Sequence, residues 1–169
     1  MIRVVRTYFE MRDRRDLRPA RLSDPEVRIE RVVDCPVAFW RFLYSEVGKR
    51  YHWVDRLVWS DDEVRRYLDD PTVSLWLMAV HGAPAGYFEL KRDEEGGVEI
   101  AYFGLLDEFT GRRLGAHLLT EATERAWEAG ATRVWLHTCT LDHPAAVPNY
   151  RARGFSDYKR EEYTVSPAE

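Results

Sequence analysis

The stretch from Glu99 to Thr120, EIAYFGLLDEFTGRRLGAHLLT, constrains the fold of this chain more than any other segment. An apolar run typical of a strand leads through a short polar loop, with Gly111 and Gly115, into an amphipathic helix. A strand, a glycine-bearing turn and a helix N-terminus together form an anion site, because free backbone N–H groups and the helix dipole both favour negative charge there. We therefore predict that this turn binds pyrophosphate.

The spacing of this turn differs from the two common phosphate-binding motifs GxGxxG and GxxxxGK[ST]. It resembles [QR]xxGx[GA], the usual form of motif A in the GNAT superfamily of acyl-CoA N-acetyltransferases. Thr110 stands where the family prefers Gln or Arg, and Arg113 stands where it prefers Gly. The resemblance implies that backbone N–H groups of the turn hold the pyrophosphate, with added charge from arginine. The implied cofactor-binding residues of the turn are Thr110, Gly111, Arg112, Arg113, Leu114, Gly115 and Ala116.

The C-terminal third extends the resemblance. Residues 133–140, RVWLHTCT, are rich in β-branched and aromatic side chains, and they predict a strand. Further on, Ala146, Tyr150 and Phe155 fit the AxxxYxxxGF pattern that closes the fourth helix of the family. His143 replaces the asparagine that the family carries early in this helix, so we do not carry that contact over.

The resemblance implies an N-acetyltransferase that moves an acetyl group from acetyl-CoA to a primary amine by direct attack. Tyr150 would protonate the departing CoA thiolate, since its O–H is a neutral donor at physiological pH. Glu99 lies where several GNAT enzymes carry a general base, at the start of the splayed strand. Glu89, on the neighbouring strand, is the alternative base. Either carboxylate could instead pair with an arginine across the sheet.

The splayed strand of the family separates from its neighbour, and its unpaired backbone groups bind the pantetheine amides of the cofactor. The resemblance assigns this role to the main chain of Phe103, Gly104 and Leu105. A non-catalytic acyl-CoA-binding or regulatory domain on the same fold is the alternative function. The joint presence of Glu99 and Tyr150 favours the enzyme, because a binding module needs neither.

An aromatic and charged cluster lies between the first two expected helices, in residues 51–59. In GNAT enzymes this region often borders the acceptor site, and an aromatic wall with a carboxylate can hold an amine. We therefore predict that Trp53 and Asp55 bind the acceptor. The alternative is a second hydrophobic cluster under a loop. A small amine, an amino acid, an antibiotic and a protein N-terminus are all open as acceptors.

Composition narrows the class of protein. The 169 residues suit one domain, residues 1–169, with 45% hydrophobic and 13% aromatic residues to form its core. A net charge of −4 argues against nucleic acid as a partner. No apolar run predicts a membrane span or a signal peptide, and the histidines show no metal-binding spacing. Cys35 and Cys139 form no disulfide framework, so we expect a cytoplasmic protein. The sequence leaves the oligomeric state open, a homodimer included.

Periodicity and turn signals predict the secondary structure. Strands are expected at Val4–Met11, Val27–Val33, Val73–Val80, Gly86–Arg92, Val98–Leu106, Arg133–Thr140 and Tyr158–Val165. Helices are expected at Val37–Val47, from a capping box at Ser60 and Glu63 to Asp70, at Leu114–Glu128, and after an N-cap at Asp142. This order predicts an α/β (α+β) fold of the GNAT type, with a mixed, mostly antiparallel central sheet, a splayed strand and flanking helices.

Overall fold

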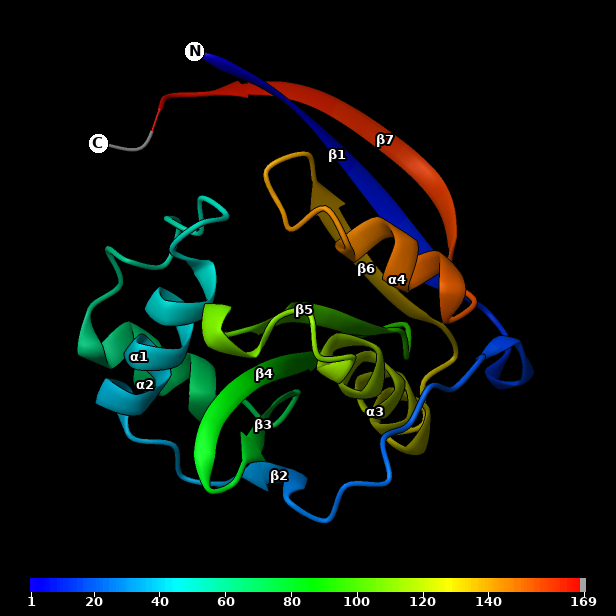
Figure 1. Ribbon diagram of the computed structural model, residues 1–169. Helices are drawn as coiled ribbons and strands as arrows, with labels where there is room; N and C mark the ends of the chain where they lie inside the picture. Colours follow the sequence, from blue (N-terminus) through cyan, green and yellow to red (C-terminus); the bar gives the residue numbers. More distant parts are fainter. Residues whose placement is uncertain (168–169) are drawn as a thin grey trace.

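The computed structural model describes residues 1–167 and contains one sheet with the strand order β2-β3-β4-β5-β6-β1-β7 (Figure 1). Every neighbouring pair is antiparallel except β5 and β6, which are parallel. The strands are β1 Ile2–Met11, β2 Val27–Val32, β3 Val73–Val80, β4 Ala83–Arg92, β5 Val98–Leu105, β6 Val134–Cys139 and β7 Ser156–Val165. The helices are α1 Val37–Gly48, α2 Asp61–Asp69, α3 Leu114–Glu128 and α4 Ala146–Ala152, with 3₁₀ turns η1 Arg14–Asp16 and η2 Asp107–Phe109. The expected mixed, mostly antiparallel sheet is confirmed.

The strand ends differ slightly from the sequence prediction. β4 begins at Ala83 rather than at Gly86, because the connection from β3 is a two-residue hairpin turn. His81 and Gly82 form this turn with φ values of 49° and 82°. Turns with two positive φ values match the twist of the flanking strands, so the pairing continues to the turn itself.

The start of α2 confirms the capping box expected from the sequence. The Glu63 N–H donates to Ser60 Oγ at 3.2 Å, and the Ser60 N–H donates to Glu63 Oε2 at 2.7 Å. Two N–H groups that would lack partners at the helix end are thereby satisfied. The capping box fixes where α2 begins, after the segment that carries Trp53 and Asp55.

The expected N-cap of α4 at Asp142 is wrong. The helix begins at Ala146, and Ala145 stands at the N-cap position without a side-chain cap. The Asp142 carboxylate instead accepts the Cys139 N–H at 2.9 Å and the Thr138 hydroxyl, so it closes the turn after β6. Because the Asp142 carboxylate accepts these two hydrogen bonds, it does not cap the helix that starts four residues later.

Hydrophobic clusters cover both faces of the sheet. One cluster joins α3 and α4 to the sheet, and it includes Phe88 and Leu118. The other joins α1 and α2 to the opposite face, and it includes Trp40 and Tyr87. Tyr87 and Phe88 are neighbours in β4 and point to opposite faces, as alternate strand residues do. β4 is therefore buried on both sides, and polar groups on this strand need partners inside the protein.

β5 and β6 separate soon after they meet. Their parallel pairing covers Val98 with Val134 and Glu99 with Trp135. Beyond these pairs, β5 stays paired with β4 to Leu105, while β6 follows β1 (Figure 1). The separation leaves the edge of β5 after Glu99 without a strand partner. The splayed strand expected from the sequence is confirmed.

Candidate functional site

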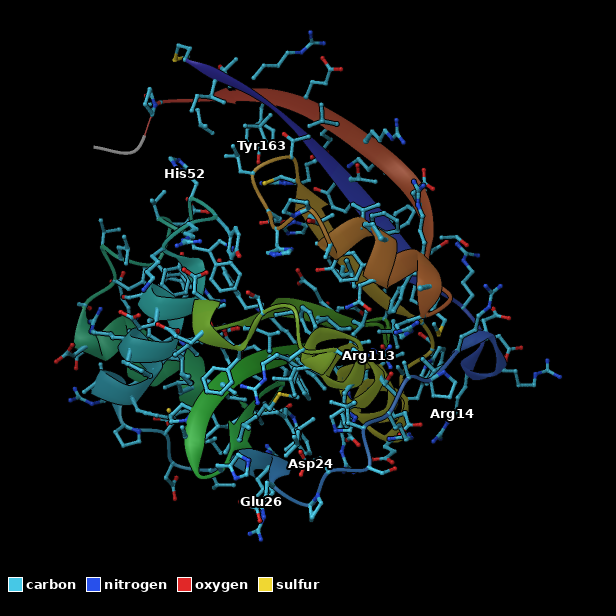
Figure 2. The ribbon with its side chains drawn as sticks, in the orientation of Figure 1. Arg14, Asp24, Glu26, His52, Arg113 and Tyr163 are labelled. Atoms are coloured by element: carbon cyan, nitrogen blue, oxygen red, sulfur yellow. The ribbon has the colours of Figure 1, made fainter. Side chains whose placement is uncertain are left out.

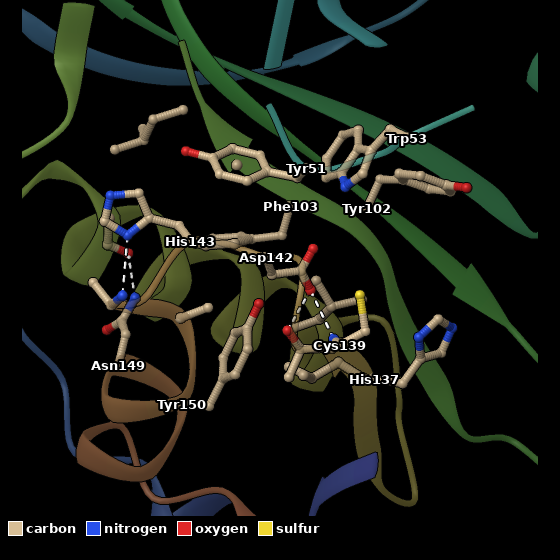
Figure 3. A pocket seen from close by; sticks show the side chains of 18 of the residues that line it. Tyr51, Trp53, Tyr102, Phe103, His137, Cys139, Asp142, His143, Asn149 and Tyr150 are labelled. Atoms are coloured by element: carbon tan, nitrogen blue, oxygen red, sulfur yellow. Dashed lines mark hydrogen bonds between the residues drawn. The ribbon is translucent and has the colours of Figure 1, made fainter. Parts of the chain in front are cut away.

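A cavity of about 450 Å³ lies where β5 and β6 separate (Figure 3). Most of its walls come from β5, β6, the start of α3, α4 and the segment between α1 and α2, and β1 and β7 add Arg6 and Tyr163. Most residues expected to form the site line this one cavity: Trp53, Asp55, Phe103, Gly104, Leu105, Thr110, Gly111, Arg113, Gly115, Ala116 and Tyr150. Arg112, Leu114, Glu89 and Glu99 are not among its lining residues.

The start of α3 forms one end of the cavity, and it has no side-chain cap. The first N–H groups of a helix have no intrahelical acceptor, so those of Leu114, Gly115 and Ala116 are free to bind an anion. A Cβ atom on Gly115 would lie 3.7 Å from its nearest neighbour, and one on Gly111 would meet nothing within 4 Å. The turn therefore has the open space and the donors that a pyrophosphate requires.

Arg113 adopts the left-handed backbone conformation, with φ 62° and ψ 7°. This conformation favours glycine, which accounts for the glycine that motif A usually has at this position. Arg113 therefore keeps the backbone geometry of the motif and adds a side chain at the N-terminal end of α3 (Figure 2). The neighbouring Arg112 packs on the ring of Phe109, 5.5 Å from its centroid, and Leu114 is buried in the core.

Asn149 contributes to the site and was missed in the sequence analysis. Its Nδ2 donates to the carbonyl oxygen of Gly115 at 3.1 Å, and its side chain lines the cavity. This bond joins α4 to the first turn of α3. The only indication in the sequence that Asn149 belongs to the site was its position directly before Tyr150.

Tyr150 is 6% exposed, and its hydroxyl points into the cavity (Figure 3). Its ring packs against Phe9, Phe103 and Phe155, with centroids 5.7, 6.3 and 6.4 Å away. Burial raises the pKa of this phenol above its usual value. The hydroxyl is therefore protonated at neutral pH and available as a donor.

The two candidate bases have different surroundings. Glu99 Oε1 lies 3.8 Å from His137 Nε2, and burial raises the pKa of the Glu99 carboxyl. Glu89 is fully buried, and both of its carboxylate oxygens contact Arg56 Nη1, at 2.8 and 3.2 Å. The guanidinium of Arg56 also lies 3.9 Å from the ring centroid of Tyr102. Glu89 therefore has an arginine partner, although this arginine lies in the segment between α1 and α2 and not across the sheet as the alternative interpretation expected.

The cluster between α1 and α2 is divided in the structure. Tyr51, His52, Trp53 and Asp55 line the cavity, while Arg56 turns inward to Glu89. Trp53 also packs against the second hydrophobic cluster, as the alternative interpretation of this segment expected. Its ring lies 5.0 Å from Tyr102 and 5.7 Å from Tyr44, which gives the cavity a wall of aromatic side chains.

Other features of the described residues bear on function. Across residues 1–167, no cluster of three or more His, Cys, Asp or Glu side chains has an arrangement that could hold a metal ion. None of the helices in that range has the length and apolar character needed to span a membrane. Cys35 and Cys139 are both free thiols.

The sequence matches the acetyltransferase (GNAT) family over residues 39–155, which is more than half of the chain. The chain belongs to the GNAT family. Enzymes of this family take the acyl group from acetyl-CoA. The match includes the turn before α3, the splayed strand and Tyr150, so most residues that line the cavity lie within it; Arg6 and Tyr163 lie outside it.

A curated relative, mycothiol acetyltransferase from Corynebacterium aurimucosum, is 34% identical over 111 residues, which cover 58% of this chain and 36% of that protein. A GCN5-related N-acetyltransferase from Sphaerobacter thermophilus has a similar fold, with a TM-score of 0.69 and 18% identity over 94% of this chain and 50% of that one. An aminoglycoside acetyltransferase from an uncultured soil metagenomic sample has a TM-score of 0.68 and 12% identity, over 86% of this chain and 99% of that one. This GNAT chain thus spans about a third of the length of the curated relative and half of the Sphaerobacter protein.

Proposed function

We propose that this chain transfers an acetyl group from acetyl-CoA to a primary amine by direct attack. One observation carries the proposal: a single cavity joins the anion-binding start of α3 to the Tyr150 hydroxyl and to an aromatic wall with Asp55. Such an arrangement suits a donor that binds by its phosphates and an acceptor that binds by its amine. Holding both reactants in one cavity contributes to catalysis by itself.

Acetyl-CoA would supply an acetyl group activated as a thioester. The N–H groups of residues 111–116 are suited to its pyrophosphate, and the Arg113 guanidinium adds positive charge beside them. The free edge of β5 at Phe103, Gly104 and Leu105 offers main-chain groups to the pantetheine amides. A main-chain N–H of this edge can also polarise the thioester carbonyl.

The acceptor amine must lose a proton before it attacks. An alkyl amine has a pKa near that of lysine, about 10.4, so only about one molecule in a thousand is neutral at pH 7. We assign the base to Glu99, which is partly buried beside the cavity, with a raised pKa. Glu89 is the less suitable carboxylate, because Arg56 already neutralises it inside the protein.

Tyr150 is assigned as the acid that protonates the departing thiolate. Its hydroxyl faces the cavity, and burial keeps it protonated. The rings around it restrict its movement, so the proton is delivered from a fixed position.

We place the acceptor amine against Trp53 and Asp55. A carboxylate attracts an ammonium group, and aromatic faces add cation–π attraction. Two proteins similar to this chain are named as acetyltransferases of mycothiol and of aminoglycosides, which supports a small-molecule acceptor. A peptide amine is the alternative acceptor.

Release of free CoA in the presence of single amines tests the proposal. A panel of small amines, amino acids, aminoglycosides and peptides with free N-termini should contain an amine that releases CoA with equal formation of acetylated product. Calorimetry with CoA alone gives binding independently of turnover. CoA binding without turnover of any amine would favour the alternative, a non-catalytic acyl-CoA-binding or regulatory domain.

A further inference from the structure

The carboxylate assigned as the base lies behind a histidine. His137 lines the cavity, whereas Glu99 is not among the lining residues. Their nearest atoms, His137 Nε2 and Glu99 Oε1, are 3.8 Å apart. The two residues project from β6 and β5 near the point where the strands separate, and Figure 3 shows His137 on the β6 side of the cavity. A proton that leaves an amine in the cavity meets the imidazole before it meets the carboxylate.

The other acids near His137 already have partners. Glu161, on β7, accepts the Tyr8 hydroxyl at 3.0 Å and forms an ion pair with Lys159 at 2.7 Å. Asp142 accepts the Cys139 N–H and the Thr138 hydroxyl. Among residues 1–167, His137 is the only basic side chain within 4 Å of the Glu99 carboxylate. Glu99 is therefore the acid best able to exchange a proton with this imidazole.

The surroundings keep His137 neutral before the reaction. The groups that face it are Arg6 and Tyr8 from β1, Glu99 from β5, Asp142 from the turn after β6, and Glu161 from β7. Burial lowers the pKa of the imidazole, the Arg6 charge lowers it further, and the charges of Asp142 and Glu161 act in the opposite sense. A neutral imidazole has one free ring nitrogen that can accept a proton.

We infer that His137 relays the proton of the acceptor ammonium to the Glu99 carboxylate. The relay rests on the proposed acetyl transfer. Nδ1 of His137 accepts a proton from R–NH₃⁺, and Nε2–H gives its own proton to Glu99 Oε1, so that the ring proton ends on Nδ1. The amine is left as R–NH₂ with a free lone pair, the imidazole is again neutral, and the carboxylate has become a carboxylic acid.

The geometry permits this transfer. The 3.8 Å separation is about 1 Å longer than an N–H···O hydrogen bond, so the two side chains must approach by about that distance before the proton moves. The His137 side chain is 36% exposed and that of Glu99 is 21% exposed. The more exposed histidine therefore also offers the route by which the proton returns to solvent after acetyl transfer.

Three variants test the relay with an amine from the CoA-release panel: His137→Phe, Glu99→Gln and the double variant. Because the two residues act in series, each should lower kcat/KM by the same factor, about 10²-fold or more, and the double variant should lose no more. CoA affinity, measured by calorimetry, should stay within about twofold of the parent, a change of less than about 0.5 kcal/mol. His81→Asn, at the exposed β3–β4 turn, is the matched control and should retain full activity.

Rescue separates proton transfer from a structural role. Free imidazole added to His137→Ala should restore part of the rate, and it should restore none in Glu99→Gln. His137→Gln gives a second variant if the phenylalanine disturbs folding. Full activity in His137→Phe with a strong loss in Glu99→Gln would overturn the relay and leave Glu99 to act through water. If no amine in the panel is acetylated by the parent protein, the proposed function itself is rejected.

Discussion

Arg56 Nη1 lies 2.8 Å from Glu89 Oε2, and this buried ion pair ties the segment that carries Trp53 and Asp55 to the centre of β4. The Arg56 side chain is 9% exposed and that of Glu89 is not exposed at all. The pair therefore holds the proposed acceptor wall against the sheet. Glu89 contributes to the site by positioning that wall.

Glu89→Gln should lower the free energy of unfolding by about 3–5 kcal/mol, because it leaves the Arg56 charge buried without a carboxylate partner. Urea unfolding at neutral pH measures this change. Glu94→Gln, in the exposed turn between β4 and β5, is the control and should change stability by less than about 0.5 kcal/mol. A loss below about 1 kcal/mol in Glu89→Gln would contradict a strong buried pair.

Gly115→Asp should weaken CoA binding by about tenfold or more, because a carboxylate would lie beside the proposed pyrophosphate site. The variant should still fold, since a Cβ atom on Gly115 lies 3.7 Å from Asn149 Nδ2 and 3.8 Å from Leu105 Cδ1. Calorimetry with CoA measures the affinity. Gly115→Ala is the matched control, because it adds the Cβ atom without the charge. Equal affinities for the two variants would move the pyrophosphate away from this turn.

Arg113→Gly should raise the free energy of unfolding by about 1 kcal/mol and should weaken CoA binding at the same time. Glycine adopts the left-handed conformation of this residue without the strain of a side chain. The loss of affinity would follow from the missing guanidinium. Arg112→Gly removes a neighbouring charge at a position without a positive φ, so it should not stabilise the protein. Thermal melting and calorimetry on the two variants separate backbone strain from charge.

The sequence was sufficient to predict most of the fold. The strands and helices have strong periodicity, and the Ser60–Glu63 capping box formed as expected. The hairpin at His81–Gly82 extended further than predicted because its turn is only two residues long. The N-cap at Asp142 failed for another reason: a competing partner, the Cys139 N–H, lies in the preceding strand. The preference of aspartate for helix N-caps does not take account of such a competing donor elsewhere in the chain.

The parts of the site formed by the backbone were predictable from the sequence. The hydrogen bonds and ion pairs between side chains were less predictable. The turn before α3 and Tyr150 lie together in one cavity, as the family pattern implied. The ion pair between Arg56 and Glu89 could not be predicted from the sequence. The two residues are 33 positions apart, and several other arginines could have paired with Glu89. The same holds for Asn149, whose bond to Gly115 crosses between two helices.

Tyr150→Phe should lower the rate of acetyl transfer by about 10²–10⁴-fold, the range typical of a lost general acid. The ring and its contacts with Phe9, Phe103 and Phe155 are kept, so CoA affinity and the melting temperature should stay near the parent values. Steady-state kinetics with an accepted amine measures the rate. Tyr158→Phe, on exposed β7, removes a hydroxyl that bonds Arg133 and does not line the cavity, so it should leave the rate unchanged. A rate within about threefold of the parent would show that water or another group protonates the thiolate.

Stability should fall below about pH 6.5, in part because His117 must stay neutral in the folded protein. Its Nδ1 accepts the Leu22 N–H at 3.2 Å, and burial lowers the pKa of the imidazole below its usual value. The unfolded chain therefore takes up a proton first as the pH decreases through about 6.5, and the free energy of unfolding declines until the pH passes the lower folded pKa. Above that range His117 adds no pH dependence.

Urea unfolding at pH 7.5 and pH 5 measures this effect. His117→Asn keeps an acceptor near the Leu22 N–H but cannot be protonated, so the stability of this variant should fall less between the two pH values. Part of the fall should persist, because burial also lowers the pKa of His137. His81→Asn, at the exposed β3–β4 turn, should keep the parental difference. An equal fall in the parent and in His117→Asn would show that protonation of His117 does not govern the loss of stability in acid.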